Sequence, residues 1–108
     1  MNGPHAAEPL SADPALTSAF EVLGQKWNGI ILHTLAQRPA RFGELRRAVP
    51  GISDRVLSSR LHDLVTSGLI TPTRLPPGPV AYTLTADGHA LTPALDRVAG
   101  WWRGRRAG

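Results

Sequence analysis

The chain has 108 residues, of which 42% are hydrophobic, so it is long enough for one domain with a modest core and too apolar to be disordered throughout. It has no cysteine, which excludes disulfides, thiolate metal sites and cysteine-based redox sensing. No apolar stretch approaches the roughly 20 residues that cross a bilayer, and the N-terminus lacks a signal-peptide pattern, so we expect a cytoplasmic protein without a membrane partner.

The positive charge is concentrated in one stretch of the chain. The formal net charge is +4, from 12 basic and 8 acidic residues. Residues 38–60, the basic segment, hold six arginines against Glu44 and Asp54, and the remaining residues carry six of each sign. Such a local surplus suits the fixed, dense negative charge of a duplex backbone. A solvated surface face is the alternative interpretation.

The N-terminal part predicts a loose arm followed by a helix. Residues 1–12 show no apolar period, and we expect them to form a flexible arm. Asp13 can cap a helix whose first position is Pro14 and which runs to about Leu23, because Gly24 interrupts it. The apolar face of this helix consists of Leu16, Phe20 and Leu23.

Three further helices surround a Pro-Gly turn. Helical spacing of apolar residues predicts a helix over 26–37, before Pro39, and a short one over 42–49 that ends at Pro50-Gly51. Ser53 then caps a fourth helix, which Ser67-Gly68 closes. Its buried stripe is Leu57, Leu61, Leu64 and Val65. Its opposite face presents Asp54, Arg55, Ser58, Ser59, His62 and Asp63.

The last third predicts a β-hairpin and a C-terminal helix. Extended segments at 69–74 and 80–84 flank a proline-rich tip, because prolines cannot donate hydrogen bonds within a central strand. Thr85 caps the final helix, in which Pro93 should cause a kink or delay the start. One face of that helix carries Leu91, Leu95, Val98 and Trp102, and we expect residues 105–108 to fray.

This order of elements predicts a mainly α fold with a small β-hairpin, a winged helix-turn-helix over residues 13–104. Seven short motifs follow one another along the chain. They are Gly24 to Trp27 with Ile30-Ile31-Leu32, Arg41 to Arg46, Pro50 to Ser53, Leu57 to Leu64, Gly68-Leu69-Ile70, Tyr82 to Thr85 with Gly88, and Trp101-Trp102. In this order they resemble the motifs of HxlR-type bacterial transcription regulators. The resemblance spans about Pro14 to Trp102.

The resemblance implies a homodimer whose first and last helices form the interface and whose fourth helix enters the major groove of double-stranded DNA. The candidate dimer residues are Leu16, Phe20, Leu95, Val98, Trp101 and Trp102. Three departures from the family pattern stand out. Many members carry a cysteine just before the first helix, where this chain has Asp13-Pro14. Pro72 stands where the family often has arginine, with Arg74 following, and the hairpin tip is short.

The candidate DNA contacts lie mainly on the fourth helix and its supports. Arginine can bond guanine through two donors, and serine can bond bases or phosphates, so the exposed face of the fourth helix suits base reading. Arginines on supporting elements suit phosphates, and Arg74 could enter the minor groove from the wing. Arg60 either braces its helix to Glu44 or Asp63 or reaches a phosphate. The full set is Arg41, Arg46, Ser53, Arg55, Ser58, Ser59, Arg60, His62 and Arg74.

Catalytic and metal sites are not predicted. His62 and Asp63 point apart on a helix, and the other histidines have no partners at ligand spacing, so we expect no enzyme activity, metal or cofactor.

The leading interpretation is a sequence-specific dimeric regulator of transcription acting on an inverted repeat. A version that responds to a small-molecule effector and a winged-helix protein-interaction module without DNA binding both remain open. The operator, the effector, the target genes and the direction of regulation are not encoded in any motif.

Overall fold

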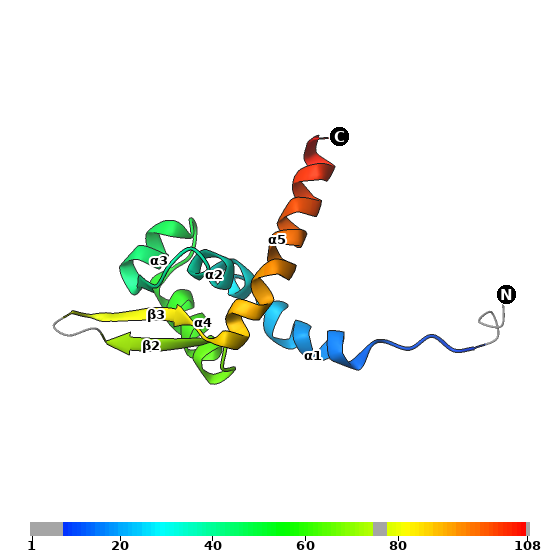
Figure 1. Ribbon diagram of the computed structural model, residues 1–108, viewed down its shortest axis with the longest axis horizontal. Coiled ribbons are helices and arrows are strands. Elements are labelled where there is room, and N and C mark those ends of the chain that lie inside the picture. Colours follow the sequence, from blue (N-terminus) through cyan, green and yellow to red (C-terminus); the bar gives the residue numbers. More distant parts are fainter. Residues whose placement is uncertain (1–7, 75–77, 108) are drawn as a thin grey trace.

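The computed structural model describes residues 8–74 and 78–107. Within them the elements follow in the order α1 (Pro14–Leu23), α2 (Asn28–Leu35), β1 (Ala40–Arg41), α3 (Phe42–Ala48), α4 (Asp54–Thr66), β2 (Ile70–Arg74), β3 (Val80–Leu84) and α5 (Ala86–Ala107). Figure 1 shows a body built on α2, α3 and α4, from which the β2–β3 hairpin, α1 and α5 project in three directions. The predicted winged helix-turn-helix, mainly α with a small hairpin, is confirmed.

Side-chain caps begin three helices where the sequence predicts them. The carboxylate of Asp13 accepts a hydrogen bond from the first turn of α1 at 2.8 Å, and the hydroxyl of Ser53 accepts one from the first turn of α4 at 3.1 Å. The hydroxyl of Thr85 accepts one from the backbone of Gly88 at 3.1 Å. A Cβ at Gly88 would lie 2.2 Å from the carbonyl oxygen of Leu69, so the start of α5 requires glycine.

The core lies where α2, α3, α4 and the sheet meet, and it is made of aliphatic side chains. Its buried members are Ile31, Leu32, Leu35, Ala40, Leu45, Val49, Ile52, Leu57, Leu61, Leu64, Ile70 and Leu84. The predicted stripe on α4 is confirmed for its three leucines. Val65 is 36% exposed and lies outside the buried set, because it sits about 100° further round the helix than Leu64.

The structure differs from the sequence prediction at α2 and β1, and it decides where α5 starts. The helix predicted over 26–37 is shorter, Asn28–Leu35. It begins only at Asn28 because Trp27 has a left-handed backbone (φ 86°) that an α-helix cannot include. The strand β1 was not predicted; it pairs antiparallel with β3 and gives a sheet of order β1-β3-β2. α5 continues through Pro93, so this proline does not delay the start, while the kink and the frayed tail stay predictions.

Candidate nucleic-acid interface

The turn between α3 and α4 fixes the angle at which α4 leaves the body. Gly51 has a φ of 89°, a left-handed conformation that favours glycine. The ring of Trp27 packs against this turn, 3.6 Å from the point where a Cβ of Gly51 would lie. Lys26 in turn covers the ring, with its Nζ 4.8 Å from the ring centroid. The Pro-Gly turn predicted from the sequence is therefore confirmed and has a packed aromatic support.

Four of the predicted contact residues share the exposed side of α4, and we call them the reading face. They are Arg55, Ser58, Ser59 and His62. Within the described parts of the chain, none of these four side chains has a hydrogen bond or ion pair. Their donors and acceptors are therefore available to an external partner. Arg55 supplies a two-donor fork, and the two serines supply short hydroxyls, a combination suited to base edges in a major groove.

Exposed arginines lie on the elements that precede and follow α4: Arg41 before α3, Arg46 and Arg47 on α3, and Arg74 on β2. Arg46 Nε lies 3.4 Å from the carboxylate of Asp54, and Arg41 Nε lies 3.8 Å from that of Glu44. The two arginine side chains are 51% and 59% exposed, and solvent screens such pairs to about 1 kcal/mol or less, so both guanidinium groups can exchange these partners for phosphates. Arg47 is exposed on α3, and Arg74 is exposed at the end of β2.

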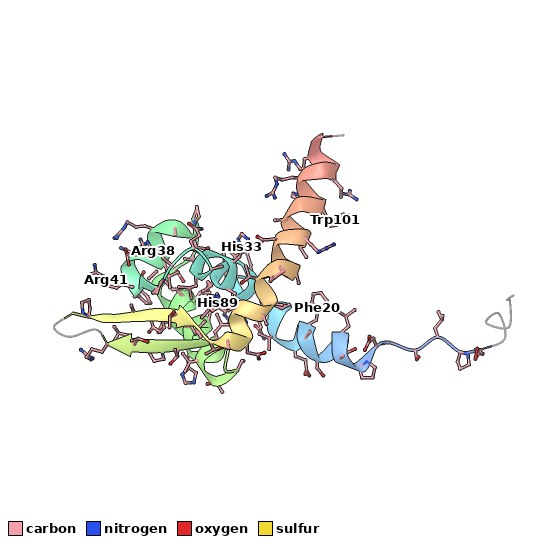
Figure 2. The ribbon with its side chains drawn as sticks, in the orientation of Figure 1. Phe20, His33, Arg38, Arg41, His89 and Trp101 are labelled. Atoms are coloured by element: carbon pink, nitrogen blue, oxygen red, sulfur yellow. The ribbon has the colours of Figure 1, made fainter. Side chains whose placement is uncertain are left out.

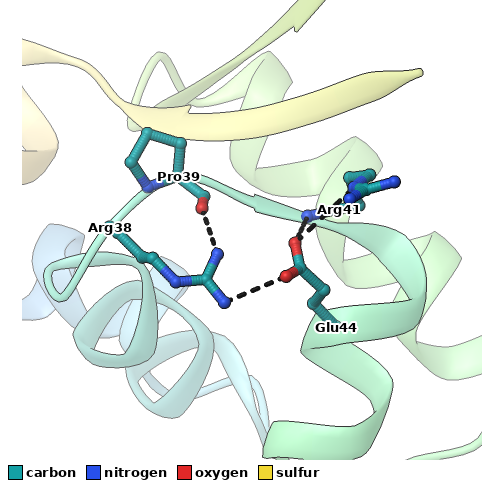
Figure 3. Close-up of polar contacts among 4 residues, drawn as sticks. All are labelled: Arg38, Pro39, Arg41 and Glu44. Carbon is teal, nitrogen blue, oxygen red and sulfur yellow. Dashed lines mark hydrogen bonds and ion pairs between the residues drawn. The ribbon is translucent and has the colours of Figure 1, made fainter. Parts of the chain in front are cut away.

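Glu44 organises the start of α3, as Figure 3 shows. Its carboxylate accepts hydrogen bonds from Arg38 Nη2 and from the backbone N–H of Arg41, both at 2.9 Å. The bond from Arg38, and after it the bond from the backbone of Arg41, lower the pKa of Glu44 to about 2. Arg38 also donates to the carbonyl of Pro39 at 2.9 Å. Arg38 was not predicted as a site residue, because it precedes β1 and no helical period connects it to Glu44.

Two predicted contact residues make bonds within the chain. The hydroxyl of Ser53 is engaged as the cap of α4, although the residue itself is exposed. Arg60 turns away from the reading face: its Nη1 donates to Gln25 Oε1 at 2.7 Å and to Asp63 Oδ2 at 3.3 Å. Of the two braces predicted for Arg60, the one to Asp63 is formed, and Gln25 is a partner that sequence spacing does not reveal.

The candidate dimer residues belong to the two projecting helices, α1 and α5. Figure 2 shows two of them, Phe20 and Trp101, on the side of the molecule away from Arg38 and Arg41. Leu16 and Phe20 of α1 are 58% and 56% exposed, and Val98, Trp101 and Trp102 of α5 are 58%, 61% and 50% exposed. Leu95 is half-buried against the core of its own chain. A bond between His33 Nε2 and Asp96 Oδ1, at 2.6 Å, connects α5 to α2 at the base of this surface.

Among the described residues, no group of three or more histidine, aspartate or glutamate side chains could hold a metal ion. No helix there is long and apolar enough to cross a membrane.

Comparisons with known proteins agree with this geometry. A family model described as HxlR-like helix-turn-helix matches residues 22–106. The HTH-type transcriptional regulator YodB of Bacillus subtilis is 39% identical over 90 residues, which cover 82% of this chain and 80% of YodB. An HTH-type transcriptional regulator of Methanothermobacter thermautotrophicus is 38% identical over 102 residues, which cover 90% of this chain and 78% of that protein.

Solved structures of transcriptional regulators share the fold of this chain. Quinone-bound YodB from B. subtilis superposes with a TM-score of 0.74 at 35% identity, covering 86% of this chain and 99% of that one. The redox regulator HypR in its reduced form superposes with a TM-score of 0.77 at 30% identity, covering 85% of this chain and 93% of the HypR chain. The chain therefore belongs to the HxlR-like helix-turn-helix family of DNA-binding transcriptional regulators.

Proposed function

We propose that this protein is a sequence-specific regulator of transcription that binds an inverted-repeat operator in double-stranded DNA as a homodimer. The observation that carries the proposal is the reading face of α4, whose four side chains are exposed and unengaged among the described residues. In this proposal α4 is the recognition helix. Arg41, Arg46, Arg47 and Arg74 contact phosphates on either side of it and set its register on the duplex.

The homodimer part of the proposal is supported by the exposed apolar side chains of α1 and α5. A single domain of this size offers one recognition helix, whereas two copies related by a two-fold axis offer two. Two such helices would enter successive major grooves about 34 Å apart and would require an inverted repeat. Phe20 of α1 and Trp101 and Trp102 of α5 are then covered by the partner subunit, which removes large aromatic surfaces from water.

The test is a selection of bound fragments from the genome that encodes the protein, followed by footprinting of the best fragment. A recurring inverted repeat, protected in both half-sites, is the expected result. Protection of one half-site by a monomer would contradict the homodimer. Absence of any enriched sequence, with a salt dependence near zero, would favour the alternative function of a winged-helix protein-interaction module.

Response to a small molecule is a second candidate function, and a hollow between α1 and α5 favours it. This hollow has a volume of about 420 Å³, and its apolar lining includes Val22 and Leu23 of α1 and Leu91 of α5. The size suits a small aromatic ligand. YodB has been solved with a bound quinone. Because this chain has no cysteine, any ligand here must bind without a thiol adduct.

This second candidate has its own test. A quinone titrated into the protein–DNA complex should release the DNA, and Leu91→Trp, which fills the hollow, should abolish the response while DNA binding persists. Release that is equally strong in the Leu91→Trp variant would place the effect elsewhere.

A further inference from the structure

The short segment between α1 and α2 touches the recognition helix through one polar contact. Gln25 lies in this segment, one residue after the end cap of α1, and its side-chain carbonyl accepts the 2.7 Å hydrogen bond from Arg60 Nη1. Arg60 belongs to α4, 35 residues further along the chain. A donor on a cation makes this one of the stronger kinds of hydrogen bond in proteins.

Arg60 is oriented towards the protein and not towards the reading face. Its side chain is only 20% exposed, while that of its second partner, Asp63, is 47% exposed. Its Nε is buried and has no hydrogen-bond partner within the described chain. Moving the guanidinium out to a phosphate would break the bonds to Gln25 and Asp63 and would leave the carboxylate of Asp63 without its cation.

The segment that carries Gln25 is itself held in place. Asn28, which is 1% exposed, donates from Nδ2 to the carbonyl of Val22 at 2.9 Å, so the start of α2 is bonded to the end of α1. The backbone of Gln25 donates to the same carbonyl at 3.2 Å. Trp27, in its left-handed conformation, packs against Gly51 in the helix-turn-helix turn. The backbone that carries Gln25 is therefore held against the end of α1 and the start of α2.

We propose that Arg60 is a positioning residue, which fastens the recognition helix α4 to the α1–α2 junction by donating to Gln25 and does not itself contact DNA. The proposal rests on the DNA-binding function proposed above. It also supplies a physical connection between the two halves of that function. α1 carries part of the candidate dimer surface, α4 carries the reading face, and Arg60–Gln25 is a direct side-chain bond between α4 and the segment that follows α1.

The experiment compares Arg60→Met and Gln25→Ala with the wild type on a duplex that the wild type selects from a random library. A random duplex of the same length measures non-specific binding, and affinities are taken between about 50 and 200 mM salt. Arg97→Met, which removes an exposed arginine from α5, controls for the loss of one positive charge. Gln25→Glu keeps the acceptor and serves as the conservative variant.

The expected result is that Arg60→Met and Gln25→Ala each weaken binding of the dimer to the selected duplex by about a hundredfold, which is about tenfold for the one charge-assisted hydrogen bond lost in each protomer. The double variant should be no weaker than either single one, because both changes remove the same bond. The slope of log affinity against log salt and the affinity for the random duplex should stay at wild-type values. Gln25→Glu should bind the selected duplex like the wild type.

A direct phosphate contact by Arg60 predicts a different pattern. Arg60→Met would then lower the salt slope by about 1.8, which is about 0.9 for each protomer, and Gln25→Ala would bind like the wild type. That pattern, or wild-type binding by both variants, overturns the proposal. If Arg60→Met fails to fold, the comparison of Gln25→Ala with Gln25→Glu decides, because Gln25 is exposed and its truncation leaves the core intact. If the wild type selects no duplex at all, the DNA-binding function itself fails.

Discussion

We expect Trp102→Ala to weaken the proposed homodimer while leaving the monomer folded. Trp102 is 50% exposed in the single chain. A whole tryptophan side chain offers roughly 250 Å², so about 125 Å² remains for a partner to cover. At about 25 cal/mol per Å² this area is worth about 3 kcal/mol in each protomer. Alanine retains part of that contact, so we take about 2 kcal/mol per protomer, or about 4 kcal/mol for the dimer. The dissociation constant should therefore rise roughly a thousandfold.

The fold should survive this change because the contacts of Trp102 in its own chain are local. The ring centroid of Trp102 lies 5.9 Å from that of Trp101. The guanidinium carbon of Arg105 lies 5.4 Å from the ring centroid of Trp102. All three residues belong to the last turns of α5 and none belongs to the buried core. Sedimentation equilibrium over a range of protein concentrations measures the dimer, and circular dichroism verifies that the variant stays helical.

Two further variants make the Trp102 result interpretable. Val65→Ala removes a partly exposed apolar side chain from α4 and should leave the dimer unchanged. Trp101→Ala should weaken the dimer less than Trp102→Ala, because Trp101 lies off the predicted apolar stripe of α5. A helical Trp102→Ala protein that stays fully dimeric and binds DNA normally would refute the reasoning. The interface would then be sought on α1, around Leu16 and Phe20.

Four other predictions concern the basic segment and the chemistry of the chain. Arg55→Ala should cost about 1–3 kcal/mol on the selected duplex and relax base preference at one position, measured by competition with mutated duplexes. Arg47→Met should lower the salt slope of the dimer by about 1.8, whereas Arg38→Met should leave it unchanged. The folded pKa of Glu44 is depressed to about 2 from 4.5, so its stabilising effect is complete above pH 4.5 and is lost as the pH falls towards 2. Urea titrations should therefore show the stability difference between wild type and Glu44→Gln shrinking over that range. Diamide should leave DNA affinity unchanged, because the chain has no thiol; DNA release without oxidation of Met1 or tryptophan would contradict this.

Local chemistry was enough to predict most of the fold. Asp13, Ser53 and Thr85 act as caps because each is a short polar side chain directly before an apolar period, and such a cap acts on the next few backbone N–H groups only. The reading face of α4 follows from the helical period, because leucines that fill one side leave the polar residues on the other. These inferences needed no knowledge of distant contacts.

Features that depend on distant contacts could not be predicted in this way. β1 has two residues and exists because β3, 40 residues later, pairs with it, so it leaves no period in the sequence. The left-handed conformation of Trp27 reflects its packing against Gly51, since a non-glycine residue rarely adopts it alone. The bond from Arg60 to Gln25 likewise joins residues whose spacing has no meaning on a single helix. The sequence suggested a brace to Asp63 because that residue is three positions away on the same helix.

The basic segment shows why a charge count alone overstates a DNA-binding surface. Its six arginines look equivalent in the sequence, yet the structure divides them. Arg38 is engaged by Glu44 and by a backbone carbonyl, and Arg60 by Gln25 and Asp63. The arginines with free or weakly paired guanidinium groups are Arg41, Arg46, Arg47 and Arg55. The two arginines with close hydrogen bonds within the chain, Arg38 and Arg60, thus stand at the two ends of the basic segment, and the four that face outward lie between them. The contrast between Arg38→Met and Arg47→Met tests this division directly, because both variants lose the same charge from the same segment.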